Sequence, residues 1–266
     1  MSVRTIVIGS LNTDLVATGL RHIPKPGEHA YGNTLHVGPG GKSRNIADML
    51  ARLVPKESVA MVGRTVEDSY GLWRQPLEAL EKAGVNTGYV RLEPNDGSSL
   101  PAIALIAVDE QGNNQIIVLP GASERFCKED IAAAADLFET VSDNNGALVL
   151  TLECPLDTAI YAVEQANQHG LKVLFDPGGL QANMDVQKLT SAGIFLIKPN
   201  EHEAQMLTGV VVTDFKSAQR AATKLLEHGV KNVLITVGAK GAYLFNHETA
   251  AHIPVTQVHS GSDEKD

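Results

Sequence analysis

The chain is organised around Val37-Gly38-Pro39-Gly40-Gly41-Lys42-Ser43-Arg44-Asn45, a glycine-rich hinge that leads directly into a helix. Apolar residues then recur with the spacing of one helical face, which predicts a helix over residues 42–54. Gly40 and Gly41 allow positive φ and a close approach to the backbone, because neither carries a Cβ. The first helical turn offers unpaired N–H groups and the side chains of Lys42 and Asn45. This stretch predicts a binding site for a small polar ligand.

Two other interpretations of this stretch have to be weighed. A phosphate-binding P-loop also ends in Gly-Lys-Ser, but it requires a glycine five residues earlier, and His36 stands there. The spacing therefore argues against a P-loop. A glycine-rich turn with a solvated lysine is the other alternative, and only the rest of the chain decides between it and a binding site.

The composition is typical of one globular unit. A chain of 266 residues can bury one large core with a small appendage, and 43% hydrophobic with 20% charged residues is ordinary for a soluble protein. The net charge of −9 argues against a nucleic-acid or anionic-membrane surface. Cys127 and Cys154 lack a paired spacing, which favours a reducing compartment. With no signal peptide and no run long enough to span a membrane, we expect a cytoplasmic protein.

Short apolar runs alternate with helical patterns along most of the chain. We predict buried strands at 5–9, 58–63, 147–151, 171–175, 194–197 and 233–236, and helices at 42–54, 69–83, 128–140, 156–169 and 214–227. Repeated strand–helix units of this kind indicate an α/β fold with a mostly parallel, doubly wound sheet. We therefore predict a single α/β domain over residues 1–266.

Two pairs of alternating strands interrupt this pattern. The first pair covers about residues 13–17 and 29–37, and the second covers 102–109 and 115–119 with a polar turn between its strands. We expect the regions 13–37 and about 100–120 to form one small β appendage inserted in the domain.

Polar residues follow several of the predicted strands, at the edge where open α/β sheets bind ligands. Asn12 and Asp14 follow the first strand, although an Asx turn explains them equally well. Glu153 follows strand 147–151, and its alternative role is a first-turn charge that favours the helix dipole. Asn200 and Glu203 open a helix and suit a hydrated Mg²⁺ beside phosphate oxygens. Their alternative role is a capping box.

Five motifs in order carry a resemblance to a known family. They are Asn12-Thr13-Asp14, Gly40-Gly41-Lys42-Ser43-Arg44-Asn45, Thr151-Leu152-Glu153-Cys154-Pro155, Lys198-Pro199-Asn200-Glu201-His202-Glu203 and Ile235-Thr236-Val237-Gly238-Ala239-Lys240-Gly241. Together the motifs resemble the ribokinase-like sugar kinases, also called the phosphofructokinase-B-type carbohydrate kinases. The resemblance covers nearly the whole chain.

The resemblance implies specific roles for these residues. The sugar would be surrounded by Asn12, Asp14, Gly40, Gly41, Lys42, Asn45 and Glu153. Asn200 and Glu203 would lie by the nucleotide phosphates and Mg²⁺, with Glu203 as the metal-binding carboxylate. Thr236, Gly238 and Gly241 would border ATP. The β appendage would be a lid over the sugar, which in ribokinases often also joins two subunits, so a homodimer through this β lid is an expectation.

The sequence departs from the family pattern in two places. A Gly-Ala-Gly-Asp type motif normally follows near the end and supplies the catalytic base, but here Ser260-Gly261-Ser262-Asp263 is followed by three residues only. We therefore expect the C-terminal part to be missing from this sequence; a naturally shortened, inactive relative is the alternative. Ser43-Arg44 also replaces a pair of small residues, so Arg44 either points to solvent or selects an anionic substrate.

The main hypothesis is an ATP-dependent sugar kinase that transfers the γ-phosphate to a hydroxyl of a pentose or hexose, with ATP and Mg²⁺ as cofactors. Its partner would be a small sugar, with neither nucleic acid nor membrane involved. A nucleoside kinase or a sugar-phosphate kinase of the same fold is the alternative within this class. A non-catalytic sugar- or nucleotide-binding relative is the alternative from another class.

Overall fold

The computed structural model describes residues 3–182 and 184–256. Within these residues the larger sheet has nine strands in the order β13-β12-β11-β10-β9-β8-β1-β4-β5. Its strands are β1 (Thr5–Ile8), β4 (Val59–Val66), β5 (Asn86–Glu93), β8 (Ala147–Thr151), β9 (Lys172–Asp176), β10 (Leu196–Ile197), β11 (Asn232–Thr236), β12 (Ala242–Phe245) and β13 (Ala250–Ile253). All neighbours from β5 to β11 pair in parallel, and β12 and β13 are antiparallel additions. The predicted mostly parallel α/β sheet is confirmed.

Helices cover both faces of this sheet because its strands are apolar on both sides. Val7 of β1 packs with α1 (Lys42–Leu53) and α2 (Arg74–Ala83), whereas Ile6 and Ile8 lie in the core cluster on the opposite face. That second cluster includes residues from α3 (Lys128–Ala132), α4 (Ala135–Asp143), α5 (Leu156–Gln168) and α8 (Phe215–Glu227). Alternate side chains along β1 thus point to opposite layers, as strand geometry requires. Two shorter helices are α6 (Gln187–Thr190) and α7 (Glu201–Thr208).

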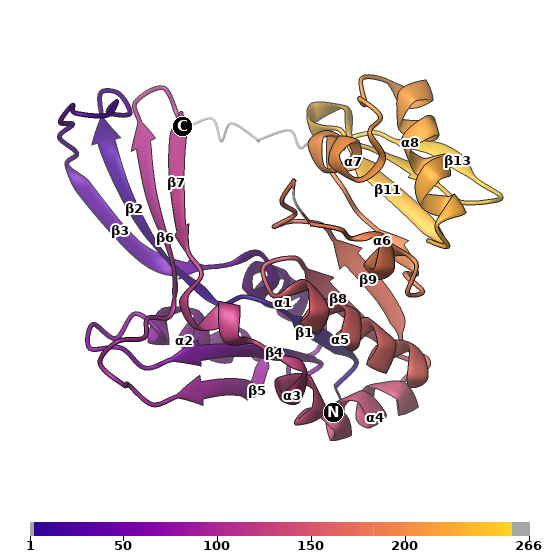
Figure 1. Ribbon diagram of the computed structural model, residues 1–266, viewed down its shortest axis with the longest axis horizontal. Coiled ribbons are helices and arrows are strands. Elements are labelled where there is room, and N and C mark those ends of the chain that lie inside the picture. The colour runs from indigo at the N-terminus through magenta and orange to yellow at the C-terminus, as the bar shows by residue number, and fades with distance from the viewer. Residues whose placement is uncertain (1–2, 183, 257–266) are drawn as a thin grey trace, which may run out of the picture.

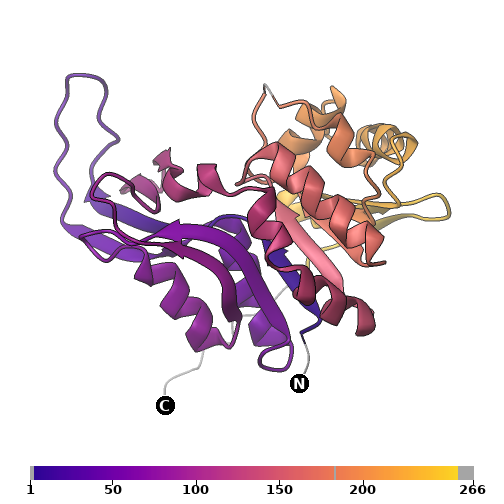
Figure 2. The same ribbon diagram turned by 60° about the horizontal axis from the view of Figure 1, so that its bottom comes forward.

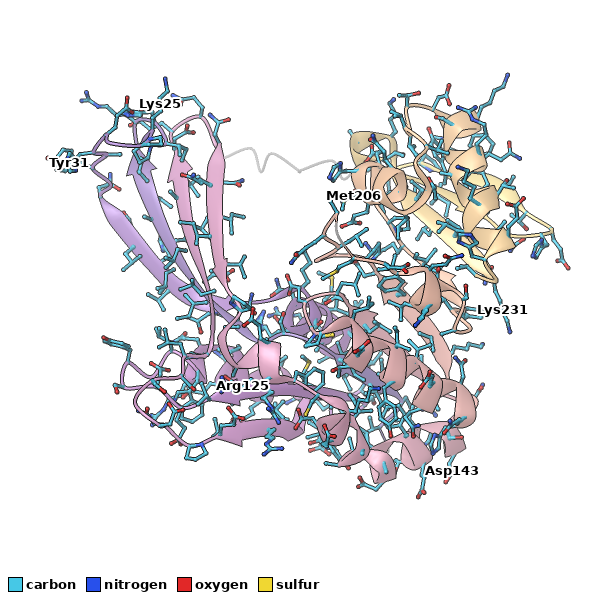
Figure 3. All side chains as sticks on the ribbon, in the orientation of Figure 1. Lys25, Tyr31, Arg125, Asp143, Met206 and Lys231 are labelled. Carbon is cyan, nitrogen blue, oxygen red and sulfur yellow. The ribbon has the colours of Figure 1, made fainter. Side chains whose placement is uncertain are left out.

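A second sheet stands away from the larger one (Figure 1). It consists of β2 (Asn12–Leu20), β3 (Thr34–Gly40), β6 (Ala102–Asp109) and β7 (Asn114–Leu119), in the order β3-β2-β6-β7. β2 pairs in parallel with β6, and the two outer pairs are antiparallel hairpins. The loop between β2 and β3 extends away from the rest of the chain (Figure 2), and Tyr31 lies on this loop (Figure 3). The predicted small β lid is therefore present as a sheet, which we call the second sheet.

The position of β3 differs from the prediction. The sequence pattern predicts a strand over 29–37 and a hinge after it, but β3 covers Thr34–Gly40 and includes most of the hinge. Backbone pairing with β2 places Gly38 opposite Asp14 and Gly40 opposite Asn12. Gly41 alone of the glycine pair has positive φ, at 91°. Gly40 is instead required by a close approach, since a Cβ there would overlap the Asp14 carboxylate.

Other element boundaries also differ from the prediction. The predicted helix 69–83 begins only at Arg74, because the Asp68 carboxylate accepts the backbone N–H groups of Tyr70 and Trp73 and holds a turn. The predicted single helix 128–140 is two helices, since Ala134 leaves the helical conformation at φ −102° and ψ 21°. Strands β5 and β12 were not predicted. β5 is an edge strand whose polar residues make ion pairs, so its hydrophobic pattern is weak.

Candidate functional site

A cavity of about 620 Å³ lies at the foot of the second sheet. The second sheet contributes Asn12, Ala102 and Val118 to its lining, and α1 contributes Lys42. The segments that follow β1 and β8 contribute Ser10, Leu152, Glu153, Cys154 and Pro155. Further lining comes from Pro120, Ser123 and Glu124 and from Gly179, Gln181 and Met184. Three of the predicted sugar-binding residues, Asn12, Lys42 and Glu153, therefore share one cavity.

Glu153 makes the principal polar contacts at the start of α1. Its Oε2 accepts the backbone N–H of Lys42 at 2.7 Å and the hydroxyl of Ser10, while its Oε1 pairs with Lys42 Nζ at 2.9 Å. The carboxylate thus satisfies an unpaired donor at a helix N-terminus that another part of the chain presents. It is 19% exposed and faces the cavity. Glu153 is therefore more than a first-turn charge of its own helix, because it fixes the first residue of α1.

Asp14 lies on the cavity side of β2, against the backbone of Gly40. Burial and the neighbouring Glu153 carboxylate raise the pKa of Asp14, and the Arg44 guanidinium opposes that rise. Two carboxylates are thus held close enough to influence each other in a partly desolvated position. Such a pair favours a ligand whose hydroxyl groups donate hydrogen bonds to both.

Arg44 neither points to solvent nor lines the cavity, so both predicted alternatives for it are unsupported. Its side chain is 6% exposed, with Nη1 donating to Asn45 Oδ1 at 2.7 Å and Nη2 near Asp48 Oδ2 at 3.3 Å. Burial lowers the pKa of Arg44, and Asp48 offsets part of that effect. Because the guanidinium engages Asn45 Oδ1, the Asn45 amide has its N–H groups left to offer a ligand.

A second pair of charges lies beside the first along the strand ends. Asp176, the last residue of β9, pairs with Lys198 Nζ at 2.9 Å, and its Oδ1 accepts the N–H of Gly178. Gly178 packs against the Lys42 side chain, where a Cβ would collide with it. The ion pairs Glu153–Lys42 and Asp176–Lys198 therefore form a continuous polar edge across β8, β9 and β10.

The predicted nucleotide residues form a separate group at the ends of β10 and β11. Asn200 caps α7 by accepting the N–H of Glu203 at 2.8 Å, and Glu203 Oε2 accepts the N–H of Asn200 at 2.9 Å. The capping-box alternative is thus confirmed in its geometry. Thr236 donates its backbone N–H to the carbonyl of Pro199 and bridges to Asn200, which brings the two motifs together.

Two predicted glycines shape the turn that follows β11. Gly238 and Gly241 have φ of 53° and 96°, and Gly241 closes the turn by accepting the N–H of Val237 at 2.8 Å. A Cβ on Gly238 would meet no atom within 4 Å, so its surface is open, whereas one on Gly241 would collide with the carbonyl of Ile253. Gly238 thus leaves space beside Asn200 and Thr236, and Gly241 is required by the packing of β13.

The remaining sugar-binding predictions border the cavity without lining it. Gly41, Gly40, Asp14 and Asn45 are not among the lining residues, and Gly41 packs against Ser10 and Asn12. Asp263 lies outside the described residues. Cys154 is buried, and burial followed by the Glu153 charge raises the pKa of its thiol to about 12, so it is not a thiolate nucleophile at neutral pH.

Several cavity residues were missed in the sequence. Ser10 contacts Glu153, and its place directly after β1 is the signal that would have found it. Ser123 and Glu124 reach the cavity from the segment after β7, where the sequence has no motif.

The chain is similar in sequence to proteins of known function over nearly its whole length. The model of the pfkB family carbohydrate kinases matches residues 4–260. The chain belongs to the pfkB family of carbohydrate kinases. This pfkB-family chain is 32% identical over 254 residues to a deoxyribokinase of Salmonella typhi, covering 96% of this chain and 78% of that protein. It is 33% identical over 255 residues to the ribokinase of Mus musculus, covering 95% of this chain and 75% of the other.

A solved structure extends the comparison to the fold. The Arabidopsis thaliana ribokinase complexed with ribose and ATP matches with a TM-score of 0.81 at 27% identity, over 96% of this chain and 78% of that one. The chain is accordingly a sugar kinase of the pfkB type with the ribokinase fold. No helix in residues 3–182 and 184–256 is long and apolar enough to cross a membrane.

Proposed function

We propose that this protein is an ATP-dependent kinase that transfers the γ-phosphate to a hydroxyl of a pentose or hexose, with ribose and 2-deoxyribose as the first candidates. The observation that carries the proposal is the convergence of Asn12, Lys42 and Glu153 on one cavity below the second sheet. Carboxylates and amides on several elements suit a ligand with many hydroxyl groups. The names of the deoxyribokinase and ribokinase relatives supply the two candidate sugars.

We propose that ATP lies at the ends of β10 and β11, beside the turn at Gly238. Among the described residues no group of three His, Cys, Asp or Glu side chains could hold a metal ion. At the start of α7 the Asn200 amide and the Glu203 carboxylate suit Mg²⁺ held mostly by water and phosphate oxygens, with Glu203 as its protein carboxylate. When bound, the ion would offset phosphate charge during transfer. Closure of the second sheet over the sugar would exclude water and so favour transfer over hydrolysis.

The acceptor that we propose is an unphosphorylated sugar. The case for a phosphorylated acceptor rested on Arg44, which is buried and paired with Asp48. A nucleoside remains an outcome of the assay below. We also place the enzyme in the cytoplasm, in keeping with two free cysteines.

We further propose a homodimer formed through the second sheet. Leu35, Val37, Leu105, Ile117 and Leu119 share the face turned away from the cavity, and each is at least 38% exposed. A contiguous apolar face of this kind typically marks an interaction site. A two-fold pairing of identical sheets would cover it on both subunits.

An ADP-release assay tests the proposal. The full-length protein is incubated with ATP, Mg²⁺ and one member of a panel: ribose, 2-deoxyribose, fructose, their phosphates and common nucleosides. We expect turnover with an unphosphorylated sugar and little release of ADP without it. Silence across the whole panel contradicts the proposal. Sugar-induced thermal stabilisation without ADP release instead identifies a non-catalytic binding protein.

A further inference from the structure

One part of the cavity lining, on a different segment from Lys42 and Glu153, carries no predicted function. The segment after β7 forms it, through Pro120 and the short 3₁₀ helix η1 (Gly121–Arg125), which contributes Ser123 and Glu124. Arg125 marks this segment at the foot of the second sheet in Figure 3. A ligand that fills this cavity would therefore lie near both Glu153 and η1.

Two residues that line this cavity each carry a buried side-chain oxygen that lacks a hydrogen-bond partner. Across residues 3–182 and 184–256, neither Asn12 Oδ1 nor Ser123 Oγ has one, although both atoms are buried. The two residues are 6% exposed and line the same cavity from two different elements, β2 and η1. An unpaired buried polar atom costs roughly 1–3 kcal/mol. Such atoms are rare in folded proteins and call for a missing partner.

The position of Ser123 is fixed by its surroundings. Its N–H donates to the carbonyl of Pro120 at 3.0 Å, and its own carbonyl accepts the N–H of Phe126 at 3.3 Å. Phe126 is 2% exposed, and its carbonyl accepts the buried hydroxyl of Thr158 at 2.9 Å. The backbone of η1 is thereby tied to α5 and the main core.

A cluster of ion pairs holds η1 from its other side. Arg125 pairs with Glu93 of β5, and Glu93 also pairs with Arg64 at 3.3 Å. Arg64 in turn contacts Asp130 of α3 at 3.0 Å, and both of these side chains are largely buried. The Ser123 hydroxyl is therefore carried on a rigid support, which a residue that selects among ligands requires.

We propose that Ser123 is a specificity-determining residue of the sugar site, with its hydroxyl forming a hydrogen bond to one hydroxyl group of the acceptor. This inference rests on the proposed sugar-kinase function. Ser123 can both donate and accept, so it suits a sugar hydroxyl, which does the same. A buried group that loses its partner disfavours any sugar lacking that hydroxyl. Ser123 thus distinguishes a sugar from its deoxy analogue at one carbon.

Titration calorimetry with D-ribose and each of its monodeoxy analogues tests this inference. We expect Ser123→Ala to bind D-ribose about tenfold more weakly than wild-type protein does, because the variant loses one hydrogen bond to the sugar. For one deoxy analogue, the two proteins are expected to bind with equal affinity. That analogue identifies the hydroxyl that Ser123 contacts.

Thr65→Val is the matched control. Thr65 also carries a buried hydroxyl without a partner in the described part of the chain, but it does not line the cavity. Both substitutions remove an unpaired buried hydroxyl, so neither should lower the melting temperature of the free protein. Only Ser123→Ala should change the affinity for ribose.

The outcomes separate the inference from the proposed function. Two results would overturn the role of Ser123 while the sugar-kinase proposal stands. In the first, Ser123→Ala binds ribose as tightly as wild-type protein does. In the second, the substitution lowers the affinity for ribose and for every deoxy analogue by the same factor. If the wild type binds none of ribose, 2-deoxyribose and fructose, the proposed function fails and this inference fails with it.

Discussion

Asp14 and Glu153 are two carboxylates held near each other in one partly desolvated site. Glu153 has partners in Ser10 and Lys42, whereas the pKa of Asp14 is raised by burial and by Glu153. The ionised form of Asp14 is therefore less favourable in the folded protein than in the unfolded chain. The free protein therefore loses stability at Asp14, and under the proposed function sugar hydroxyl groups would be the partners of this carboxylate.

Asp14→Asn is expected to stabilise the free protein and weaken sugar binding. Because the pKa of Asp14 is raised on folding, the wild-type protein loses stability as pH rises from 3.8, the pKa of this carboxyl in the unfolded chain, through its pKa in the folded protein. The melting temperatures of variant and wild type should therefore agree below about pH 3.8 and diverge above it, with the variant higher. Sugar affinity should fall roughly ten- to a hundredfold, the worth of a charged hydrogen bond. A variant that melts lower than wild type at pH 7 would contradict this account.

Glu153→Ala is expected to abolish stabilisation by sugar while leaving stabilisation by ATP. The variant also removes the acceptor at the start of α1, so the free energy of unfolding should drop by about 1–2 kcal/mol. Thermal shift with each ligand separately measures both effects. Asp157→Ala is the matched control, because Asp157 is an exposed first-turn acid of α5. If both variants behave alike towards sugar, Glu153 acts only as a helix-start charge.

Among the residues of the cavity, those that belong to sequence motifs were predicted from the sequence. Asn12, Lys42 and Glu153 were predicted and meet at one cavity. Ser123 could not be predicted, because a serine after a hairpin has no distinguishing local pattern. The burial of Arg44 was also not predictable, since its partner Asp48 lies one helical turn away and nothing local orients the pair inward.

Helices α7 and α8 both begin with a capping box, but the surroundings of the two boxes differ. Asn200 and Glu203 form a capping box on α7, and Asp214 and Ser217 form one on α8. The first of these boxes bridges through Asn200 to Thr236, which precedes the turn at Gly238. A comparison of the two helices can therefore separate the structural role of a cap from the proposed role of Asn200 and Glu203 in binding nucleotide.

Glu203→Gln is expected to keep the cap and impair the binding of Mg²⁺ with ATP. Glutamine can still accept the N–H of Asn200, so the free energy of unfolding should change by less than about 0.5 kcal/mol. The melting-temperature rise produced by ATP with Mg²⁺ should shrink, because the carboxylate charge is gone.

Asp214→Ala supplies the contrast for this test. Losing the α8 cap should cost about 1 kcal/mol of stability and leave the nucleotide-induced shift unchanged. A nucleotide shift in Glu203→Gln equal to that of wild type would show that Glu203 serves the cap alone.

Element boundaries were predicted less well than element types. Helix α1 was predicted within one residue because its apolar spacing and preceding glycines agree. β3 was misplaced because Gly38, Pro39 and Gly40 have no strand propensity, and pairing with β2 decides their conformation. Tertiary contacts thus overrode local preference where the site is built.

The two sheets differ in their place in the molecule: the larger sheet carries the hydrophobic core, and the second sheet borders the cavity. The inner face of the second sheet contributes Asn12, Ala102 and Val118 to the cavity, and its outer face is apolar. The α/β alternation made this architecture predictable, because buried parallel strands and helices have different periods. Strands β5 and β12 were not predictable, since β5 has few apolar residues and β12 has no α-helix between it and β11.

Ile117→Glu is expected to convert the proposed dimer to a monomer. Ile117 is 54% exposed on the outer face, and a charge there would be buried against its partner. Sedimentation velocity at several concentrations measures the change.

Ile116→Glu is the control for that variant. Ile116 is 52% exposed but points to the inner face, since neighbouring strand residues alternate. It should leave the dimer intact. A wild-type protein that sediments as a monomer, or equal dissociation by both variants, would contradict the proposed interface.

The place of β1 within the larger sheet has a consequence for how the chain is made. β1 is synthesised first, yet it lies between β4 and β8, and Thr5 pairs with Ala147. Until the ribosome has released β8, one edge of β1 has no neighbour, and apolar strands with open edges aggregate. Chaperone protection of the nascent chain should therefore end only after Thr151 has emerged.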